Sequence, residues 1–398
     1  MQFYSAWPFF VCVALLLALA NTPAFAAADT PPSAAPNRIK AMDGLRGFLA
    51  LGVVFAHVAL YHSYLLTGIW DQGPTRFYIA LGSAGVGMFF MITGYLFWGK
   101  LLRDRGRPAW LQLYIGRIFR IGPLYVAAAV GMLVIVAFVT HFHLNVSPQA
   151  LIGQVGAWLA LGFVDGPDVN NFPLTTVLLA GVTWSLVYEW RFYLALLLLA
   201  PAARLKTKHQ LFVAIALSAC LIHMVLHPYV SFLFRACALF LAGMLCASLK
   251  ENGLLARLPN RLGSLAALVL LAASFVFSNS VTQVLCLGLV FYLIASGCTI
   301  FGLLVSRPAR RLGDISYGIY LLQGFPLAAL FRFKPLQGAL LTSPLYHWGA
   351  GLLAAALLIA LATAAHVWIE RPGIKLGKRL STFVERSVPI GAKPQRAT

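Results

Sequence analysis

Residues 121–140 read IGPLYVAAAVGMLVIVAFVT, a run that contains no charged side chain. An apolar run of ~20 residues is long enough to cross the hydrocarbon core of a bilayer as one helix. The apolar runs of this sequence are continuous, unlike the short segments of alternating hydrophobicity in membrane β-barrels. The sequence therefore predicts an all-α, polytopic membrane bundle of about ten transmembrane helices. The other nine spans are expected at residues 45–65, 77–98, 174–200, 211–227, 230–249, 263–278, 281–304, 314–333 and 345–369.

Composition excludes a water-soluble enzyme of ordinary type. Of the 398 residues, 60% are hydrophobic and only 10% are charged, whereas a soluble domain carries about 25% charged residues. The net charge of +19 would suggest nucleic-acid binding in a soluble protein, but cytoplasmic loops of membrane proteins also collect Lys and Arg. The six cysteines lie in apolar runs without metal-ligand spacing, so neither disulfides nor a metal site is predicted.

Basic and charge-poor loops alternate along the chain. The positive-inside rule places the basic loops, at 38–46, 99–120, 204–208, 250–261, 307–311 and 371–379, in the cytoplasm. The charge-poor loops, at 66–76, 228–229, 279–280 and 334–344, then lie outside. This map requires residues 141–173 to stay outside, so we expect the short apolar stretch Leu151–Val164 to be an interfacial or re-entrant helix.

The N-terminal segment, residues 1–27, is hydrophobic and ends in Ala24-Phe25-Ala26, which resembles a signal-peptide cleavage site. It lacks the basic region that normally begins a signal peptide, and cleavage would leave the first span running in the wrong direction. An uncleaved extra span with its N-terminus outside fits the charge pattern, while cleavage and a misassigned start codon are the alternatives. A linker at 28–37, a membrane domain at 38–372 and a basic cytoplasmic tail at 373–398 are expected to follow.

Ionisable side chains inside a span are costly and mark function or specific pairing. His57 lies eleven residues after Arg46, which is about three helical turns or 16 Å. The two side chains should therefore share one face, with Arg46 at the membrane surface and His57 near the middle of the bilayer. A buried imidazole can abstract a proton. The alternative is a histidine that is only hydrogen-bonded between helices.

Two further polar patterns stand out. Ser185, Glu189 and Tyr193 are spaced i, i+4, i+8 and should form one polar stripe on an apolar helix, either as a structural network or in a direct role. Arg117 and Arg120 share a helical face and could bind phosphate bidentately. Spacing alone favours the alternative, in which the two arginines only anchor the helix at the cytoplasmic surface.

Asp43-Gly44-Leu45-Arg46-Gly47 followed by His57 resembles the opening of the acyltransferase 3 family of integral-membrane acyltransferases. The resemblance covers about residues 38–372, and Thr93 and Gln323 depart from the family pattern, Gln323 standing where a second histidine is often found. We expect the stand-alone form, without an SGNH-type hydrolase domain. The later motifs, in the family's order, are FFMITGYL at 89–96, RIFRIGPLY at 117–125, WSLVYEWRFY at 184–193, RACALFLAG at 235–243, LGDISYGIYL at 312–321, and Glu370 with Pro372.

The resemblance implies an O-acyltransferase of the cell inner membrane. It implies transfer of an acyl group, most often acetyl, from cytoplasmic acyl-CoA to a hydroxyl of a cell-envelope carbohydrate or lipid-linked acceptor, with no metal. The residues expected to carry the reaction are His57 and Glu189 as catalytic groups, Arg46, Arg117 and Arg120 as acyl-CoA ligands, and Asp43, Trp184, Ser185, Tyr193 and Arg235 as supporting groups.

Two mechanisms fit this assignment. His57 could deprotonate the acceptor hydroxyl for direct transfer, which we favour because it needs a single pocket joining donor and acceptor, or it could carry the acyl group covalently. A proton-coupled transporter or flippase of a glycan or lipid is the main alternative function. Such a protein would be expected to contain two similar halves with broken helices, and the sequence has no visible internal repeat.

Overall fold

The computed structural model describes residues 2–29, 39–71, 73–227, 232–277 and 280–387. Every regular element within these ranges is a helix, apart from an isolated bridge between Val169 and Phe172. The predicted all-α class is confirmed.

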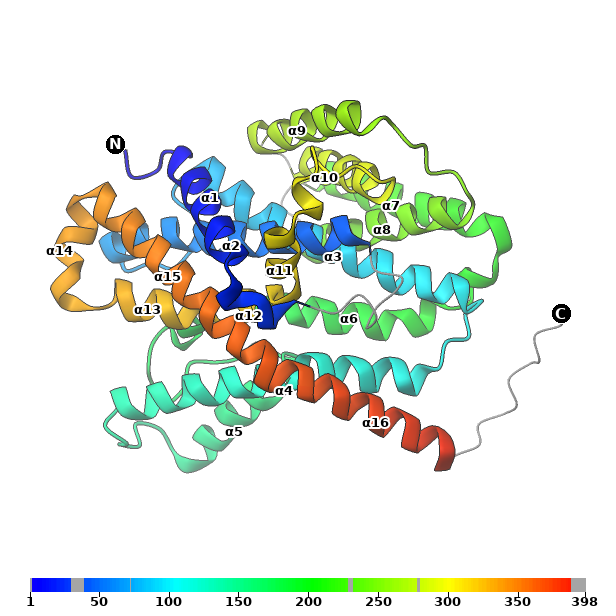
Figure 1. Ribbon diagram of the computed structural model, residues 1–398. Coiled ribbons are helices and arrows are strands. Elements are labelled where there is room, and N and C mark those ends of the chain that lie inside the picture. Colours follow the sequence, from blue (N-terminus) through cyan, green and yellow to red (C-terminus); the bar gives the residue numbers. More distant parts are fainter. Residues whose placement is uncertain (1, 30–38, 72, 228–231, 278–279, 388–398) are drawn as a thin grey trace.

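Most of the long helices lie side by side along a common direction (Figure 1). The α-helices are α1 (Trp7–Asn21), α2 (Lys40–Thr67), α3 (Arg76–Arg103), α4 (Trp110–Val139), α5 (Pro148–Leu159), α6 (Trp184–Leu199), α7 (His209–Leu226), α8 (Phe232–Glu251), α9 (Asn260–Val276), α10 (Ser280–Ala295), α11 (Arg307–Asp314), α12 (Ser316–Leu322), α13 (Gly324–Phe331), α14 (Lys334–Thr342), α15 (Pro344–Ala365) and α16 (Arg371–Ser387). Short 3₁₀ turns are η1 (Pro23–Ala28), η3 (Thr175–Leu179), η4 (Ala202–Arg204), η5 (Lys206–Lys208) and η6 (Leu303–Val305), and η7 (His366–Glu370) is a π turn.

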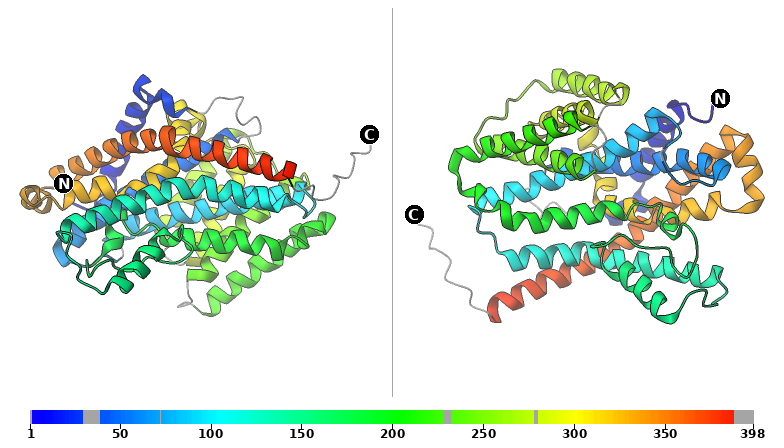
Figure 2. Two further views of the ribbon diagram at one scale, coloured as in Figure 1. Left: turned by 90° about the horizontal axis from the view of Figure 1, so that it is seen from below. Right: turned by 180° about the vertical axis from the view of Figure 1, so that it is seen from behind.

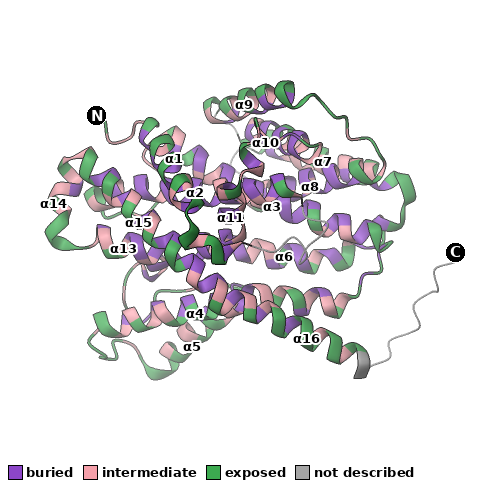
Figure 3. Cartoon of the chain, in the orientation of Figure 1, coloured by how far each residue is buried: buried purple, intermediate pink, exposed green. Residues whose placement is uncertain are grey.

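Among the described residues, six helical segments are long and apolar enough to cross a membrane. They comprise α2, α3, α4, the segment Lys206–Leu226 that contains α7, α8, and Pro344–Glu385, which joins α15 to α16. Three shorter apolar helices, α1, α9 and α10, accompany them. The outer surface carries many exposed large apolar side chains, such as Leu198 and Ile152, while the buried residues gather between the helices (Figure 3). The chain is a multi-pass membrane protein.

The expected single span at residues 174–200 is wrong. The first part of this range forms the 3₁₀ turn η3, and α6 begins only at Trp184. Leu174, Ala180 and Gly181 adopt positive φ angles of 57°, 53° and 66°. Left-handed residues cannot continue a right-handed helix, so the apolar composition of this stretch reflects burial rather than a continuous span.

Three other expected spans differ in extent. The span expected at 281–304 ends as a helix at Ala295, and the one expected at 314–333 is divided into α12 and α13 at Gln323. The last span continues through the π turn η7 into α16, so the beginning of the expected tail is helical. The stretch Leu151–Val164 overlaps the 12-residue helix α5, which begins at Pro148, ends at Leu159 and is too short to cross a bilayer.

Glycines allow two helix pairs to approach backbone to backbone. A Cβ placed on Gly94 of α3 would lie 2.3 Å from the carbonyl oxygen of Phe240, and one on Gly243 of α8 would lie 2.0 Å from that of Met91. Small residues at helix crossings permit this close packing in membranes. The contact fixes the part of α3 that lines the site described below.

The second close pair joins the first core helix to a helix late in the chain. A Cβ on Gly313 of α11 would lie 1.8 Å from the carbonyl oxygen of Asp43 in α2, and one on Gly47 would lie 2.7 Å from the carbonyl oxygen of Ala309. The α2–α11 crossing therefore sets the position of α12, which follows α11 directly.

Candidate active site

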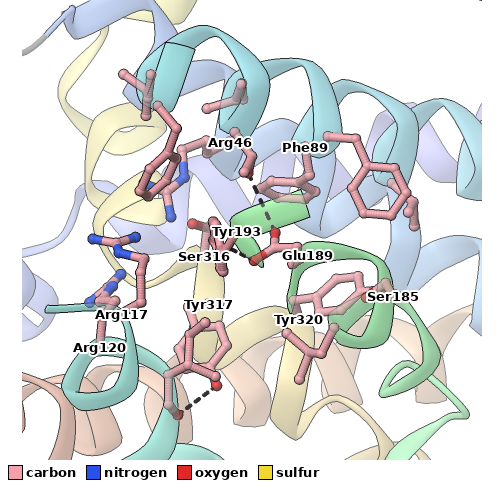
Figure 4. Close-up of a pocket in the computed structure, with 18 residues that line it drawn as sticks. Arg46, Phe89, Arg117, Arg120, Ser185, Glu189, Tyr193, Ser316, Tyr317 and Tyr320 are labelled. Atoms are coloured by element: carbon pink, nitrogen blue, oxygen red, sulfur yellow. Dashed lines mark hydrogen bonds between the residues drawn. The ribbon is translucent and has the colours of Figure 1, made fainter. Parts of the chain in front are cut away.

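A cavity of about 130 Å³ lies between α2, α3, α4, α6 and α12. Three arginines from two helices reach it: Arg46 from α2, and Arg117 and Arg120 from α4. Arg117 and Arg120 lie together on one side of the cavity (Figure 4). Phe89 and Phe90 of α3 contribute apolar walls. A chamber that combines several guanidinium groups with aromatic walls suits a ligand with anionic and apolar parts.

The polar residues of α6 also face this cavity. Ser185, Glu189 and Tyr193 all line it, as expected from their spacing. The Tyr193 hydroxyl donates to Glu189 Oε2 at 2.9 Å, and the Thr93 hydroxyl lies 3.5 Å from Glu189 Oε1. The Glu189 carboxyl is therefore held by two hydroxyl groups from different helices and points to the interior of the cavity (Figure 4).

Arg120 has an acidic partner that sequence spacing did not reveal. Its Nη1 lies 2.7 Å from Glu370 Oε2, and the Glu370 side chain is fully buried. His366 Nδ1 lies 3.2 Å from the same carboxylate oxygen, across the π turn. Figure 2 shows α4 and α16, the helix that follows the turn, side by side in both views. Arg120 thus joins the cavity wall to the last long helix, a structural role in addition to any ligand contact.

Tyrosines of α12 form a further wall of the cavity, which adjoins α4. The Tyr320 hydroxyl donates to Ser185 Oγ at 2.8 Å, and the Tyr317 hydroxyl donates to the carbonyl oxygen of Ile121 at 2.8 Å. The Arg120 guanidinium carbon lies 5.8 Å from the centre of the Tyr317 ring. These contacts connect α12 to both α4 and α6 and hold the cavity together.

His57 does not line this cavity. Its Nδ1 lies 3.0 Å from Oε1 of Gln323, and its ring is parallel to that of Trp70, with centroids 5.8 Å apart and an interplanar angle of 7°. Gln323 Nε2 donates to the carbonyl oxygen of Tyr320 at 2.7 Å. Because this bond directs the amide oxygen at His57, Nδ1 must carry the proton, and the lone pair is on Nε2.

Besides His57, three of the expected site residues lie outside this cavity. Trp184 packs edge-on against Phe232, and Arg235 hydrogen-bonds to Gln283 in a separate network between α8 and α10. Asp43 lies at the α2–α11 crossing described above. The structure therefore brings together six of the ten expected site residues around one cavity, namely Arg46, Arg117, Arg120, Ser185, Glu189 and Tyr193.

Several residues that build the site had been given no role from the sequence. They are Thr93, Ser316, Tyr317, Tyr320, Gln323, His366 and Glu370. Most belong to motifs that already stood out by their resemblance to the family, so the motif positions were a usable signal. Their partners were not predictable, because the contacts join helices that are far apart in the sequence.

In the described part of the chain, no three or more His, Cys, Asp or Glu side chains lie close enough together to hold a metal ion. The six cysteines are free thiols.

Comparison with known proteins now adds to this geometry. Residues 39–367 match the acyltransferase domain that defines the acyltransferase 3 family. The exopolysaccharide production protein ExoZ of Rhizobium meliloti (strain 1021) is 26% identical over 319 residues, covering 76% of this chain and 93% of that protein. No solved structure matches. Since the family match spans most of the chain and the cavity lies within it, the protein belongs to the acyltransferase 3 family of membrane acyltransferases.

Proposed function

We propose that the protein is an enzyme of the inner membrane that transfers an acyl group, namely acetyl, from cytoplasmic acyl-CoA. The acceptor is a hydroxyl of a cell-envelope carbohydrate or of a lipid-linked molecule. The observation that carries this proposal is the convergence of Arg46, Arg117 and Arg120 on one cavity. Each lies in the half of its helix that begins at a loop which the charge pattern places in the cytoplasm.

The arginine-lined cavity suits the phosphorylated end of the donor. Arg46, Arg117 and Arg120 all provide positive charge to its lining, and Arg120 also pairs with Glu370 at 2.7 Å. Guanidinium groups bind phosphate oxygens bidentately and remain charged in apolar surroundings. We therefore assign Arg46, Arg117 and Arg120 as phosphate ligands, of which Arg120 also positions α4 against the last helix.

His57 supplies the base in this proposal. Eleven residues of helix separate it from Arg46, a rise of about 16 Å, so it lies deeper in the membrane than the phosphate ligands. Its contact with Gln323 leaves Nε2 with a lone pair that can accept a proton. Tyr320 connects the arginine-lined cavity to the surroundings of His57. Its carbonyl oxygen accepts a hydrogen bond from Gln323, and its side chain lines the cavity.

The proposed reaction is a direct transfer. Nε2 of His57 takes the proton of the acceptor hydroxyl while the hydroxyl oxygen forms a bond to the thioester carbonyl carbon. The carbon–sulfur bond then breaks, and the leaving thiolate receives the proton from Nε2, so that the products are an ester and free CoA. In this proposal Glu189 orients the acyl donor within the cavity, where its carboxyl accepts hydrogen bonds from Tyr193 and Thr93.

The class of acceptor is inferred from the relative. The name of ExoZ associates that protein with exopolysaccharide production, which supports a carbohydrate of the cell envelope as the acceptor here. A carbohydrate hydroxyl would have to reach His57 from the outer half of the membrane, because the arginine cavity occupies the inner half.

The experiment compares His57→Gln with a matched control, His143→Gln, which changes an exposed histidine in an outer loop. Purified protein in lipid vesicles is supplied with labelled acetyl-CoA and an envelope glycan fraction, and ester formation is measured. The His57 variant should lose ~10²–10⁴-fold in rate while it still binds acetyl-CoA, and the control should retain full activity. Near-normal transfer by His57→Gln, or no transfer by the unmodified protein, would refute the proposal.

A further inference from the structure

The N-terminal segment, residues 2–29, lies outside the family match at 39–367, yet it is tightly bound to the domain. The contact is most specific at its C-terminal end. Arg311 of α11 is only 1% exposed. Its Nε and Nη2 donate to the two carboxylate oxygens of Asp29 at 2.7 and 2.9 Å, and its Nη1 donates to the carbonyl oxygens of Ala20 and Thr22 at 2.5 and 2.7 Å.

A second arginine binds the same end of the segment. Arg371 donates to the carbonyl oxygens of Ala27, Ala28 and Asp29 at 2.7, 3.0 and 2.8 Å. Arg307 adds an ion pair to Asp29 at 3.1 Å. The turn η1 ends at Ala28, and the last carbonyl groups of a helical turn lack partners within it. Arginine side chains of the domain thus supply hydrogen-bond donors to the C-terminal end of the segment.

The opposite end of the segment is bound just as specifically. The Tyr4 hydroxyl lies 2.7 Å from Nδ1 of His62, and the Tyr78 hydroxyl donates to the carbonyl oxygen of Ser5 at 2.7 Å. His62 lies near the C-terminal end of α2, and Tyr78 lies in the first turn of α3. The loop charges place the turn between these two helices outside the membrane.

The middle of the segment covers the domain with an apolar face. The Phe9 ring contacts the Phe55 ring edge-on at 5.8 Å. Nearer the N-terminal end, Trp348 of α15 donates to the carbonyl oxygen of Phe3 at 3.0 Å. Helix α1 packs against α11 and α15. Its buried residues are Pro8, Cys12, Val13, Leu16 and Ala20.

The two ends therefore contact opposite sides of the membrane domain. Residues 3–5 meet elements beside the charge-poor loops, whereas residues 20–29 meet arginines of the basic loops. In Figure 1 the N-terminus lies at the same end of the bundle as α14, and α16 ends at the opposite end. A signal peptide runs the other way, because its cleavage site must emerge outside.

We propose that residues 2–29 are a permanently retained span, with the N-terminus outside and Asp29 at the cytoplasmic surface, which forms part of the folded protein. In this orientation Ala24-Phe25-Ala26 lies on the side of the membrane opposite to signal peptidase and is not a processing site. Loss of the segment would leave the buried Arg311 without the acceptors of four hydrogen bonds, and an unpaired buried charge is strongly unfavourable.

The orientation is tested with single cysteines at two exposed positions, Gln2→Cys and Ala27→Cys, and a membrane-impermeant maleimide applied to intact cells. The unmodified protein measures the background from its own six cysteines. We expect labelling of Gln2→Cys in intact cells, and of Ala27→Cys only after the membrane is permeabilised. External labelling at position 27, or absence of residue 2 from the purified chain, would overturn the proposal.

Retention is tested separately from folding by N-terminal sequencing of protein purified through a C-terminal tag. The sequence should begin at the first residues, both in the unmodified protein and after replacement of the exposed Ala24 and Ala26 by leucine, which blocks signal peptidase. A shorter N-terminus that the leucine variant lengthens would contradict retention. In addition, Asp29→Asn should lower the melting temperature, whereas Asp71→Asn, which alters an exposed acidic residue of an outer loop, should not.

Discussion

Replacing Gly313 by alanine should greatly lower the rate of acyl transfer, because it should push α11 away from α2. A Cβ at residue 313 would lie 1.8 Å from the carbonyl oxygen of Asp43, which belongs to the backbone of α2 and cannot rotate away. Ordinary contact begins near 3.4 Å, so α2 and α11 must separate by about 1.6 Å.

The magnitude follows from what these two helices carry. Arg46 is on α2, and α11 leads directly into α12 with Tyr317 and Tyr320, so a separation of the helices opens the cavity between its walls. Overpacking of this kind costs ~1–3 kcal/mol of stability. A misplacement of about 1 Å in a reacting geometry lowers a rate ~10²-fold. We therefore expect Gly313→Ala to lose at least two orders of magnitude in acyl transfer and to melt at a lower temperature.

The matched control is Gly349→Ala, because a Cβ at this helical position meets nothing within 4 Å. Alanine favours a helix over glycine by ~1 kcal/mol, so the control should be as stable as the unmodified protein or slightly more stable, with unchanged activity. Ester formation from labelled acetyl-CoA and thermal unfolding in detergent are measured for both variants. If Gly313→Ala retains normal rate and melting temperature, the close crossing of α2 and α11 is not what positions the cavity.

Two further predictions concern charged groups. Arg117→Lys should raise the KM for acetyl-CoA by an amount equivalent to ~1–3 kcal/mol, because lysine cannot bind phosphate bidentately; steady-state kinetics with an unchanged KM would reduce Arg117 to an anchor of α4. The Arg311 and Arg307 guanidinium groups hold the pKa of Asp29 below its usual value of 3.8. The contribution of the ionised Asp29 carboxylate to the stability of the folded protein is therefore complete above pH 3.8, and it is lost as the pH falls through the lowered pKa. The difference in melting temperature between the unmodified protein and Asp29→Asn should be constant from pH 5 to 7 and shrink in stronger acid.

The sequence was sufficient to predict the class of fold and six of the residues that line the cavity. Residues 121–140 have no charged side chain, and this alone identified a membrane helix that the structure contains in α4. The i, i+4, i+8 spacing of α6 put Ser185, Glu189 and Tyr193 on one face, and all three line the cavity. These predictions succeeded because they depend on the period of a single helix.

Contacts between helices were beyond such reasoning. The pairs Arg120–Glu370 and His57–Gln323 join residues that are 250 and 266 positions apart, and no periodicity relates them. The expected span at 174–200 failed for a different reason. Hydropathy measures only burial, and the backbone at Ala180 and Gly181 turns into the left-handed region without any loss of apolar character.

The amide of Gln323 is neutral at every pH, whereas a carboxylate in its place would carry a negative charge. A carboxylate stabilises the imidazolium that forms when its histidine partner takes a proton, and an amide does so far less. In the proposed reaction, a protonated His57 stacked on Trp70 is thus a short-lived species in apolar surroundings. In that proposal the proton passes to the departing thiolate within the same encounter, so the His57 ring would begin and end every cycle uncharged.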